Sequence, residues 1–145
     1  MTYKVEFDAE ENMIIARAQG PLKLAELIQL VIDFVVLAKQ VNCSYILTIL
    51  NEAELKISMF EFYTFPQLVT DIFKAHGLQT YNFKRAFVGT VEQKSLEFYE
   101  AVSQNRGNYT HLFFDIEEAK QWLHKDQVEH KRREMKSLGE KIPRI

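Results

Sequence analysis

The chain has 145 residues, of which 47% are hydrophobic, and this length fits one domain with a substantial core. Five glycines and three prolines exclude a collagen-like or disordered class, and the single cysteine, Cys43, excludes an internal disulfide and a cysteine-based zinc site. The formal net charge is −2 at neutral pH, so we do not expect nucleic acid to be the main partner of the folded part.

The chain opens with two strand-like segments. Residues Tyr3 to Phe7 and Met13 to Ala18 are apolar or alternating, and the polar stretch DAEEN joins them. This pattern predicts an antiparallel hairpin. Gly20-Pro21 then interrupts the pattern, because glycine and proline together favour a break between elements.

A long apolar helix is expected next, over Leu22 to Gln40, because apolar residues recur there at helical spacing. Four residues extend the apolar surface beyond one core stripe: Leu30, Ile32, Val36 and Leu37. Either the domain covers this helix on two sides, or its outer flank meets another subunit, which predicts a homo-oligomer.

The run YILTIL, residues 45–50, is aliphatic and β-branched almost throughout, which predicts a central strand buried on both faces. Cys43 precedes it and is expected to be a reduced, half-buried thiol.

Residues 58–77 predict two helical pieces. Two capping-box patterns occur, Ser58 with Glu61 and Thr64 with Gln67. Proline is tolerated in a first helical turn but not in a helix interior, so Pro66 separates them. We therefore expect a short turn at Ser58 to Tyr63 and a helix from about Phe65 to Ala75, ended by Gly77.

Strand and helix alternate in the remaining chain. RAFVGT, residues 85–90, predicts a strand, and a third capping box, Thr90 with Gln93, begins a helix that includes residues 96–102. His111 to Phe114 predict the last strand, and Asp115 caps a closing helix that buries Ala119, Trp122 and Leu123. The order of elements predicts an α/β fold with a mixed, mostly parallel sheet, an N-terminal hairpin and helical crossovers.

Residues 124–145 form a charged extension beyond this domain, with seven basic and four acidic residues. Apolar residues at helical spacing, Val128, Met135, Leu138 and Ile142, predict a helix over Asp126 to Leu138 that docks on the domain or on a second subunit. The alternative is a solvated basic tail.

No segment predicts a membrane span. The most apolar run, Leu27 to Val41, is shorter than the roughly 20 apolar residues that a span needs, and it contains Asp33 and Lys39. The N-terminus has neither the basic nor the apolar region of a signal peptide, so we expect a cytoplasmic protein.

Three segments together carry a family resemblance: KRAFVGT (84–90), FYEAVSQNRG (98–107) and LFFDIEEAKQWL (112–123). They resemble the SpoIIAA-like proteins, a group related to STAS domains (sulfate transporter and anti-sigma-factor antagonist). The resemblance covers roughly residues 3 to 123. It implies a small α/β domain at residues 1–123, of a group that serves protein regulation or ligand binding more often than catalysis.

Ser58 is one candidate site residue. The resemblance implies a phosphorylated serine at the start of the helix after the central strand, and the matching stretch here is LKISMFEFY, residues 55–63. This stretch offers Ser58 but lacks the acidic neighbour, the second serine and the glycine of the family pattern. The alternative is that Ser58 only caps a helix.

Asn105 and Arg106 form a second candidate site. Asn or Gly after a helix closes it, so Gly107 and Asn105 fit a helix end, and Arg106 fits the negative end of the helix dipole. Because guanidinium makes a planar fork, Arg106 also suits either an anion or a carboxylate of this chain such as Asp115.

The sequence predicts no catalytic residue, metal site or cofactor. The four histidines are widely spaced, and no phosphate loop, nucleophile elbow or Cys-His couple occurs. We therefore expect a non-enzymatic regulatory or scaffold domain that acts through protein contacts, as a homodimer. The alternative is a carrier or sensor of an apolar or amphipathic small molecule in a cleft near Phe60 to Phe65, where aromatic residues such as Tyr63 are dense.

Overall fold

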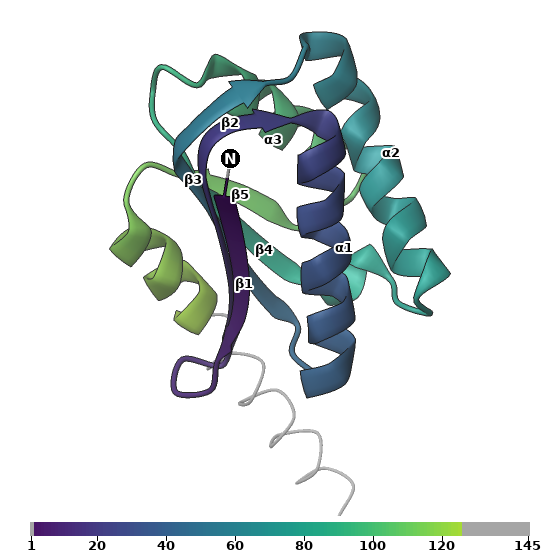
Figure 1. Cartoon of the computed structure of the whole chain (residues 1–145). Helices are drawn as coiled ribbons and strands as arrows, with labels where there is room; N and C mark the ends of the chain where they lie inside the picture. The colour runs from purple at the N-terminus through teal and green to yellow at the C-terminus, as the bar shows by residue number, and fades with distance from the viewer. Residues whose placement is uncertain (1, 126–145) are drawn as a thin grey trace, which may run out of the picture.

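A computed structural model describes residues 2–125 (Figure 1). The elements follow in this order: β1 (Thr2–Asp8), β2 (Met13–Lys23), α1 (Leu24–Val41), β3 (Tyr45–Lys56), α2 (Met59–Ala75), the short 3-10 helix η1 (Thr80–Asn82), β4 (Lys84–Val88), α3 (Lys94–Asn105) and β5 (Thr110–Phe113). Residues 116–125 form a further helix. The expected α/β fold with a mixed sheet and an N-terminal hairpin is confirmed.

The sheet has five strands in the order β1-β2-β3-β4-β5. β1 pairs antiparallel with β2, and the three following pairs are parallel. Because each crossover moves one strand further in the same direction and right-handed crossovers are the rule, α1, α2 and α3 lie on one face of the sheet. The helix at residues 116–125 lies against the opposite face, as Figure 1 shows.

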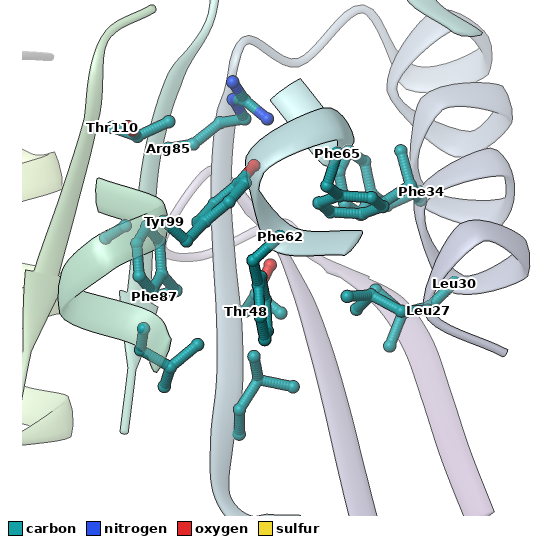
Figure 2. A pocket seen from close by; sticks show the side chains of 14 residues that line it. Leu27, Leu30, Phe34, Thr48, Phe62, Phe65, Arg85, Phe87, Tyr99 and Thr110 are labelled. Atoms are coloured by element: carbon teal, nitrogen blue, oxygen red, sulfur yellow. The ribbon is translucent and has the colours of Figure 1, made fainter. Parts of the chain in front are cut away.

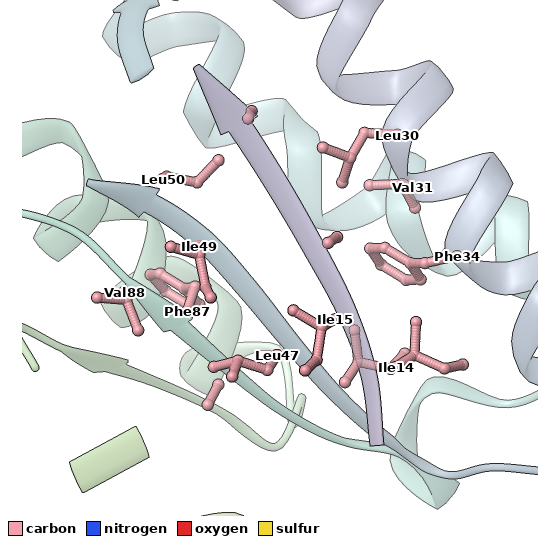
Figure 3. Packing of buried hydrophobic residues seen from close by; sticks show 14 of the residues in the cluster. Ile14, Ile15, Leu30, Val31, Phe34, Leu47, Ile49, Leu50, Phe87 and Val88 are labelled. Carbon is pink, nitrogen blue, oxygen red and sulfur yellow. The ribbon is translucent and has the colours of Figure 1, made fainter. Parts of the chain in front are cut away.

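The core is built on both faces of β2, β3 and β4, as the apolar run at residues 45–50 predicted. Alternate residues of each strand point to opposite faces, so Ile14 and Ile46 lie toward α1 to α3, whereas Leu47 lies toward the last helix. Leu30 and Phe34 of α1 pack on the first face (Figure 3). Each fully buried aliphatic or aromatic side chain contributes about 1.5–3 kcal/mol to folding.

The prediction that Gly20-Pro21 ends the second strand was wrong. β2 continues through both residues to Lys23, and Leu22 is a buried strand residue rather than the start of α1. The pairing of β1 with β2 stops at the pair Thr2 and Gln19, so within residues 2–125 the rest of β2 has no strand partner on that edge, where a proline is tolerated.

The prediction that Pro66 divides the second helical region was also wrong. α2 is continuous, with Ser58 as its N-cap and Pro66 inside it. A proline inside a helix costs about 3 kcal/mol, but the unbroken helix buries both Phe62 and Phe65, which is worth a similar amount. Thr64 does not cap a second helix, because its hydroxyl donates a hydrogen bond to the carbonyl of Glu61, 3.0 Å away.

The structure confirms two predicted glycine caps and corrects one strand boundary and the burial of two residues. Gly77 and Gly107 have left-handed φ values of 76° and 81° and close α2 and α3, as predicted. Strand β5 begins and ends one residue before the predicted range. Cys43 is fully buried rather than half-buried, and Leu30 is a core residue rather than part of an exposed flank.

The closing helix follows the sequence prediction, except that Trp122 is only partly buried. The backbone N–H of Glu118 donates to the carboxylate of the cap Asp115, and Ala119 and Leu123 are fully buried. Nearly all of the charged extension predicted at 124–145, including the helix over Asp126 to Leu138, lies outside the described residues. None of the helices within residues 2–125 has the length and apolar character needed to cross a membrane.

Candidate functional site

The structure places Ser58 as a helix cap. Its hydroxyl accepts a hydrogen bond from the backbone N–H of Glu61 at 3.1 Å, and the Glu61 carboxylate accepts from the N–H of Ser58 at 2.8 Å. These two bonds are the reciprocal capping box that the sequence indicated. The cap accounts for a serine at this position without any modification.

The other predicted site residues come together in part, on the outer surface of α2 and α3. The guanidinium carbon of Arg106 lies 5.6 Å from the ring centre of Tyr63, and its Nη1 is 3.4 Å from the side-chain oxygen of Gln67. Arg106 thus rests against α2 and not against Asp115. Phe60 lies on the same helix as Tyr63 and is 74% exposed, whereas Asn105 is the last residue of α3 and is exposed.

A cavity of about 50 Å³ lies between the sheet and the three helices on its first face. Its walls come from α1, α2 and α3, and its floor comes from β3, β4 and the start of β5. The lining residues are Leu27, Leu30, Val31, Phe34, Thr48, Leu50, Phe62, Phe65, Arg85, Ala86, Phe87, Leu96, Tyr99 and Thr110. Most of these side chains are apolar, and arginine is the one charged type among them.

Arg85 is the unusual residue of this cavity. It is the second residue of β4 and is only 6% exposed, although it carries a charge. Figure 2 shows its guanidinium at one end of the pocket, with the hydroxyl end of Tyr99 pointing toward it. Among the described residues, neither Nε nor Nη2 of Arg85 has a hydrogen-bond partner. Its aromatic neighbour is Phe73, whose ring centre is 5.6 Å from the guanidinium carbon.

Three further buried polar groups without partners in the described chain belong to the same corner of the molecule. They are the hydroxyls of Ser103 and Thr110 and the amide nitrogen of Asn108. Thr110 is the strand partner of Arg85 on β5, and the backbone N–H of Asn108 donates to the carbonyl of Ser103 at 3.1 Å. Buried polar groups are nearly always hydrogen-bonded, so four unsatisfied side chains in one corner require an explanation.

The neighbouring cation on β4 is held very differently. Lys84 points to the opposite face of the sheet, where its ammonium lies 3.9 Å from the ring centre of Trp122 and 5.0 Å from that of Tyr109. Cation–π contact offsets part of the lost hydration of a buried ammonium. This contact also fixes the last helix to the sheet, because Trp122 belongs to that helix.

Elsewhere, burial raises the pKa of the Cys43 thiol, against the opposing effect of backbone hydrogen bonds. A buried thiol with a raised pKa is a poor nucleophile, because the thiolate is the reactive form. Within residues 2–125 no cluster of three or more His, Cys, Asp or Glu side chains is arranged to hold a metal ion.

The sequence indicated a cleft near Phe60 to Phe65 as an alternative, and Phe62 and Phe65 do line the cavity, but it did not indicate Arg85 as a residue of that site. The signal was present as an arginine inside the apolar run RAFV, at a position where neighbouring strand residues are buried. A charged residue is almost never fully buried unless it is paired, so this arginine marked either a partner or a site.

Five strands in this order, with three helices on one face and a fourth on the other, define a SpoIIAA-like fold. A protein of the DUF3478 family from Shewanella loihica PV-4, described as having a SpoIIAA-like fold, matches with a TM-score of 0.50 and 17% identity, over 84% of this chain and 92% of that chain. The anti-sigma factor antagonist SpoIIAA in its unphosphorylated form matches with a TM-score of 0.43 and 14% identity, over 73% of this chain and 99% of that chain.

No family model matches the chain. No curated protein matches it either. At 17% identity the similarity to the Shewanella loihica structure establishes the fold alone, because one fold serves many functions. The fold that the sequence resemblance implied is thereby confirmed.

Proposed function

We propose that the chain is a non-enzymatic regulatory or scaffold domain that binds a protein partner through the outer face of the first half of α2. One observation carries this proposal. Met59, Phe60 and Tyr63 are exposed by 52%, 74% and 52%, and all three lie in the first five residues of the helix. We call these three residues the α2 patch.

The composition of the α2 patch supports a protein contact. Large exposed apolar side chains that lie next to one another are uncommon on monomeric surfaces and mark interaction sites. Aromatic residues, methionine and arginine are enriched in protein interfaces, and Arg106 lies against the ring of Tyr63. None of these side chains is needed for the core, so an exposed phenylalanine at position 60 has no role within the described domain.

The test compares the wild type with Phe60→Asp and with a matched control, Tyr81→Asp. Tyr81 is 70% exposed but lies in η1, away from the α2 patch. Both variants should melt within a few degrees of the wild type, because surface substitutions change stability by about 0.5 kcal/mol or less. Affinity capture followed by mass spectrometry should identify a protein that binds the wild type and Tyr81→Asp but not Phe60→Asp.

Reconstitution with that purified partner decides the outcome. Loss of a central aromatic contact typically costs 2 kcal/mol or more, so Phe60→Asp should weaken binding at least about 30-fold while Tyr81→Asp should not. Equal binding by all three proteins would place the contact elsewhere and refute the proposal.

The alternative expectation, a carrier or sensor of a small molecule, concerns the inner side of the same helix. The structure has a cavity beneath Phe62 and Phe65, and the exposed Phe60 is not among the residues that line it.

A further inference from the structure

We propose that the cavity beneath α2 is a binding site for a small organic acid, whose carboxylate pairs with Arg85 and whose apolar part lies among the aromatic and aliphatic walls. This proposal is independent of the protein contact at the α2 patch, because it concerns residues on the inner side of the helix. Either proposal can fail without the other.

Arg85 places a positive charge in the wall of the cavity although it is almost fully buried. A guanidinium remains protonated at all physiological pH values, so it cannot escape burial by losing its proton. None of the described residues that line the cavity is acidic, and no ion pair to Arg85 is formed within residues 2–125. A buried charge is normally paired, since removing it from water is expensive. An anion supplied from outside would complete the pair.

Two nitrogens of Arg85, Nε and Nη2, have a geometry that suits a carboxylate. Nε and Nη2 lie on the same edge of the guanidinium, and their N–H bonds run parallel. These are the two nitrogens of Arg85 that are both buried and without a partner in the described chain. Two parallel N–H bonds match the two oxygens of a carboxylate, which binds such a fork in a bidentate manner. The unpaired hydroxyl of Thr110, on the neighbouring strand, provides a further donor at the same end.

The walls of the cavity are mostly apolar. Away from Arg85 the cavity is lined by side chains such as Phe62, Phe65 and Leu27, which can contact hydrocarbon but cannot hydrate an anion (Figure 2). An inorganic phosphate or chloride would leave this apolar part empty. A ligand with one carboxylate and an apolar body satisfies both ends, as small-molecule sites generally do with a few polar groups in an apolar pocket.

The volume limits the size of the acid. A single water molecule needs roughly 10–15 Å³ of cavity on this measure, so about 50 Å³ admits three or four waters or a compact molecule of several heavy atoms. Waters alone would supply hydrogen bonds to Thr110 and Arg85 but no negative charge. An apolar cavity that holds benzene has a volume of roughly 150 Å³, so a ring does not fit here, and a short-chain monocarboxylate is the class of ligand that does.

The experiment uses the full chain at neutral pH and matched ionic strength. Acetate, propanoate and butanoate are titrated by calorimetry and by thermal melting, each beside its uncharged amide. We expect at least one acid to bind with a Kd on the order of 0.1–1 mM and its amide to bind at least about tenfold more weakly. Inorganic phosphate and chloride should not raise the melting temperature at the same concentration.

Variants locate the binding. Arg85→Leu should abolish binding of the acid, whereas the control Arg17→Leu removes an exposed arginine on the opposite face and should bind like the wild type. Thr110→Val keeps the volume of the side chain, removes the hydroxyl and should weaken binding several-fold, which serves as a second test if Arg85→Leu does not fold. The proposal is overturned if no acid binds at about 10 mM, if acid and amide bind equally, if inorganic anions have the same effect, or if Arg85→Leu retains the affinity.

Discussion

Gln93 is predicted to be a stability determinant although it is a half-buried polar residue. Its side-chain oxygen accepts a hydrogen bond from the backbone N–H of Thr90 at 2.7 Å, and its amide nitrogen donates to the carbonyls of Leu50 and Ala53, both at 2.9 Å. It therefore joins the loop after β4 to the far part of β3. Each such bond contributes about 1 kcal/mol net, so Gln93→Ala should lower the free energy of unfolding by about 2–3 kcal/mol.

Urea unfolding followed by circular dichroism measures this loss. The control is Glu92→Ala, which changes an exposed neighbour whose side chain has no hydrogen bond to the described residues, and it should stay within about 0.5 kcal/mol of the wild type. The slope of the transition should remain the same in all three proteins, because the surface exposed on unfolding does not change. A loss below about 0.5 kcal/mol for Gln93→Ala would show that water replaces its three bonds and would refute the reasoning.

Three further predictions concern a cap, a titration and self-association. Ser58→Ala should lose about 0.5–2 kcal/mol in urea unfolding while Ser58→Asp, an equally good cap, should not; a destabilised Ser58→Asp would contradict the capping role. The Tyr3 hydroxyl donates a hydrogen bond of 2.5 Å to Asp33, and this bond, followed by burial, raises the pKa of Tyr3 above 10.0. The contribution of this hydroxyl to stability is therefore present below pH 10 and is lost as the pH rises through the higher pKa of the folded state. The melting temperature of Tyr3→Phe should accordingly fall less steeply than that of the wild type above about pH 10, and parallel curves would argue against this coupling. Self-association through the outer side of α1 remains a prediction: sedimentation at high micromolar concentration should give a dimer, and Val36→Asp, which changes an exposed residue of that helix, should give a monomer, whereas a monomeric wild type would end the idea.

The two errors in the predicted elements share one cause. Local rules place a break at Gly20-Pro21 and at Pro66, because proline disfavours both a central strand and a helix interior. Among the described strands, β2 has no partner at Pro21 on the side of β1, and α2 gains the burial of Phe62 and Phe65 by continuing through Pro66. Neither condition can be read from a short window of sequence.

The candidate site residues also differ in whether their contacts are local or join distant parts of the chain. Ser58 and Gly107 act as the sequence indicated, because a cap involves residues only three to five positions apart. The contact of Arg106 with Tyr63 joins two helices, whereas the sequence left open either an anion or a carboxylate such as Asp115 as the partner of Arg106. The sequence predicted, as an alternative, an apolar cleft near Phe60 to Phe65, but not the place of Arg85 in the cavity, because the lining residues come from six elements that are far apart along the chain.

The sequence by itself determined the order of strands and helices, the N-terminal hairpin and the helix ends at Ser58, Gly77, Gly107 and Asp115, since these depend on the periodicity of apolar residues and on capping contacts between near neighbours. Only the tertiary structure decided that Lys84 and Arg85, adjacent on one strand, have opposite environments. Successive strand residues point to opposite faces of a sheet, and the aromatic rings of Tyr109 and Trp122 are available on one face alone. The charge of Arg85 is left facing an apolar cavity because three helices converge there, and no local pattern encodes that convergence.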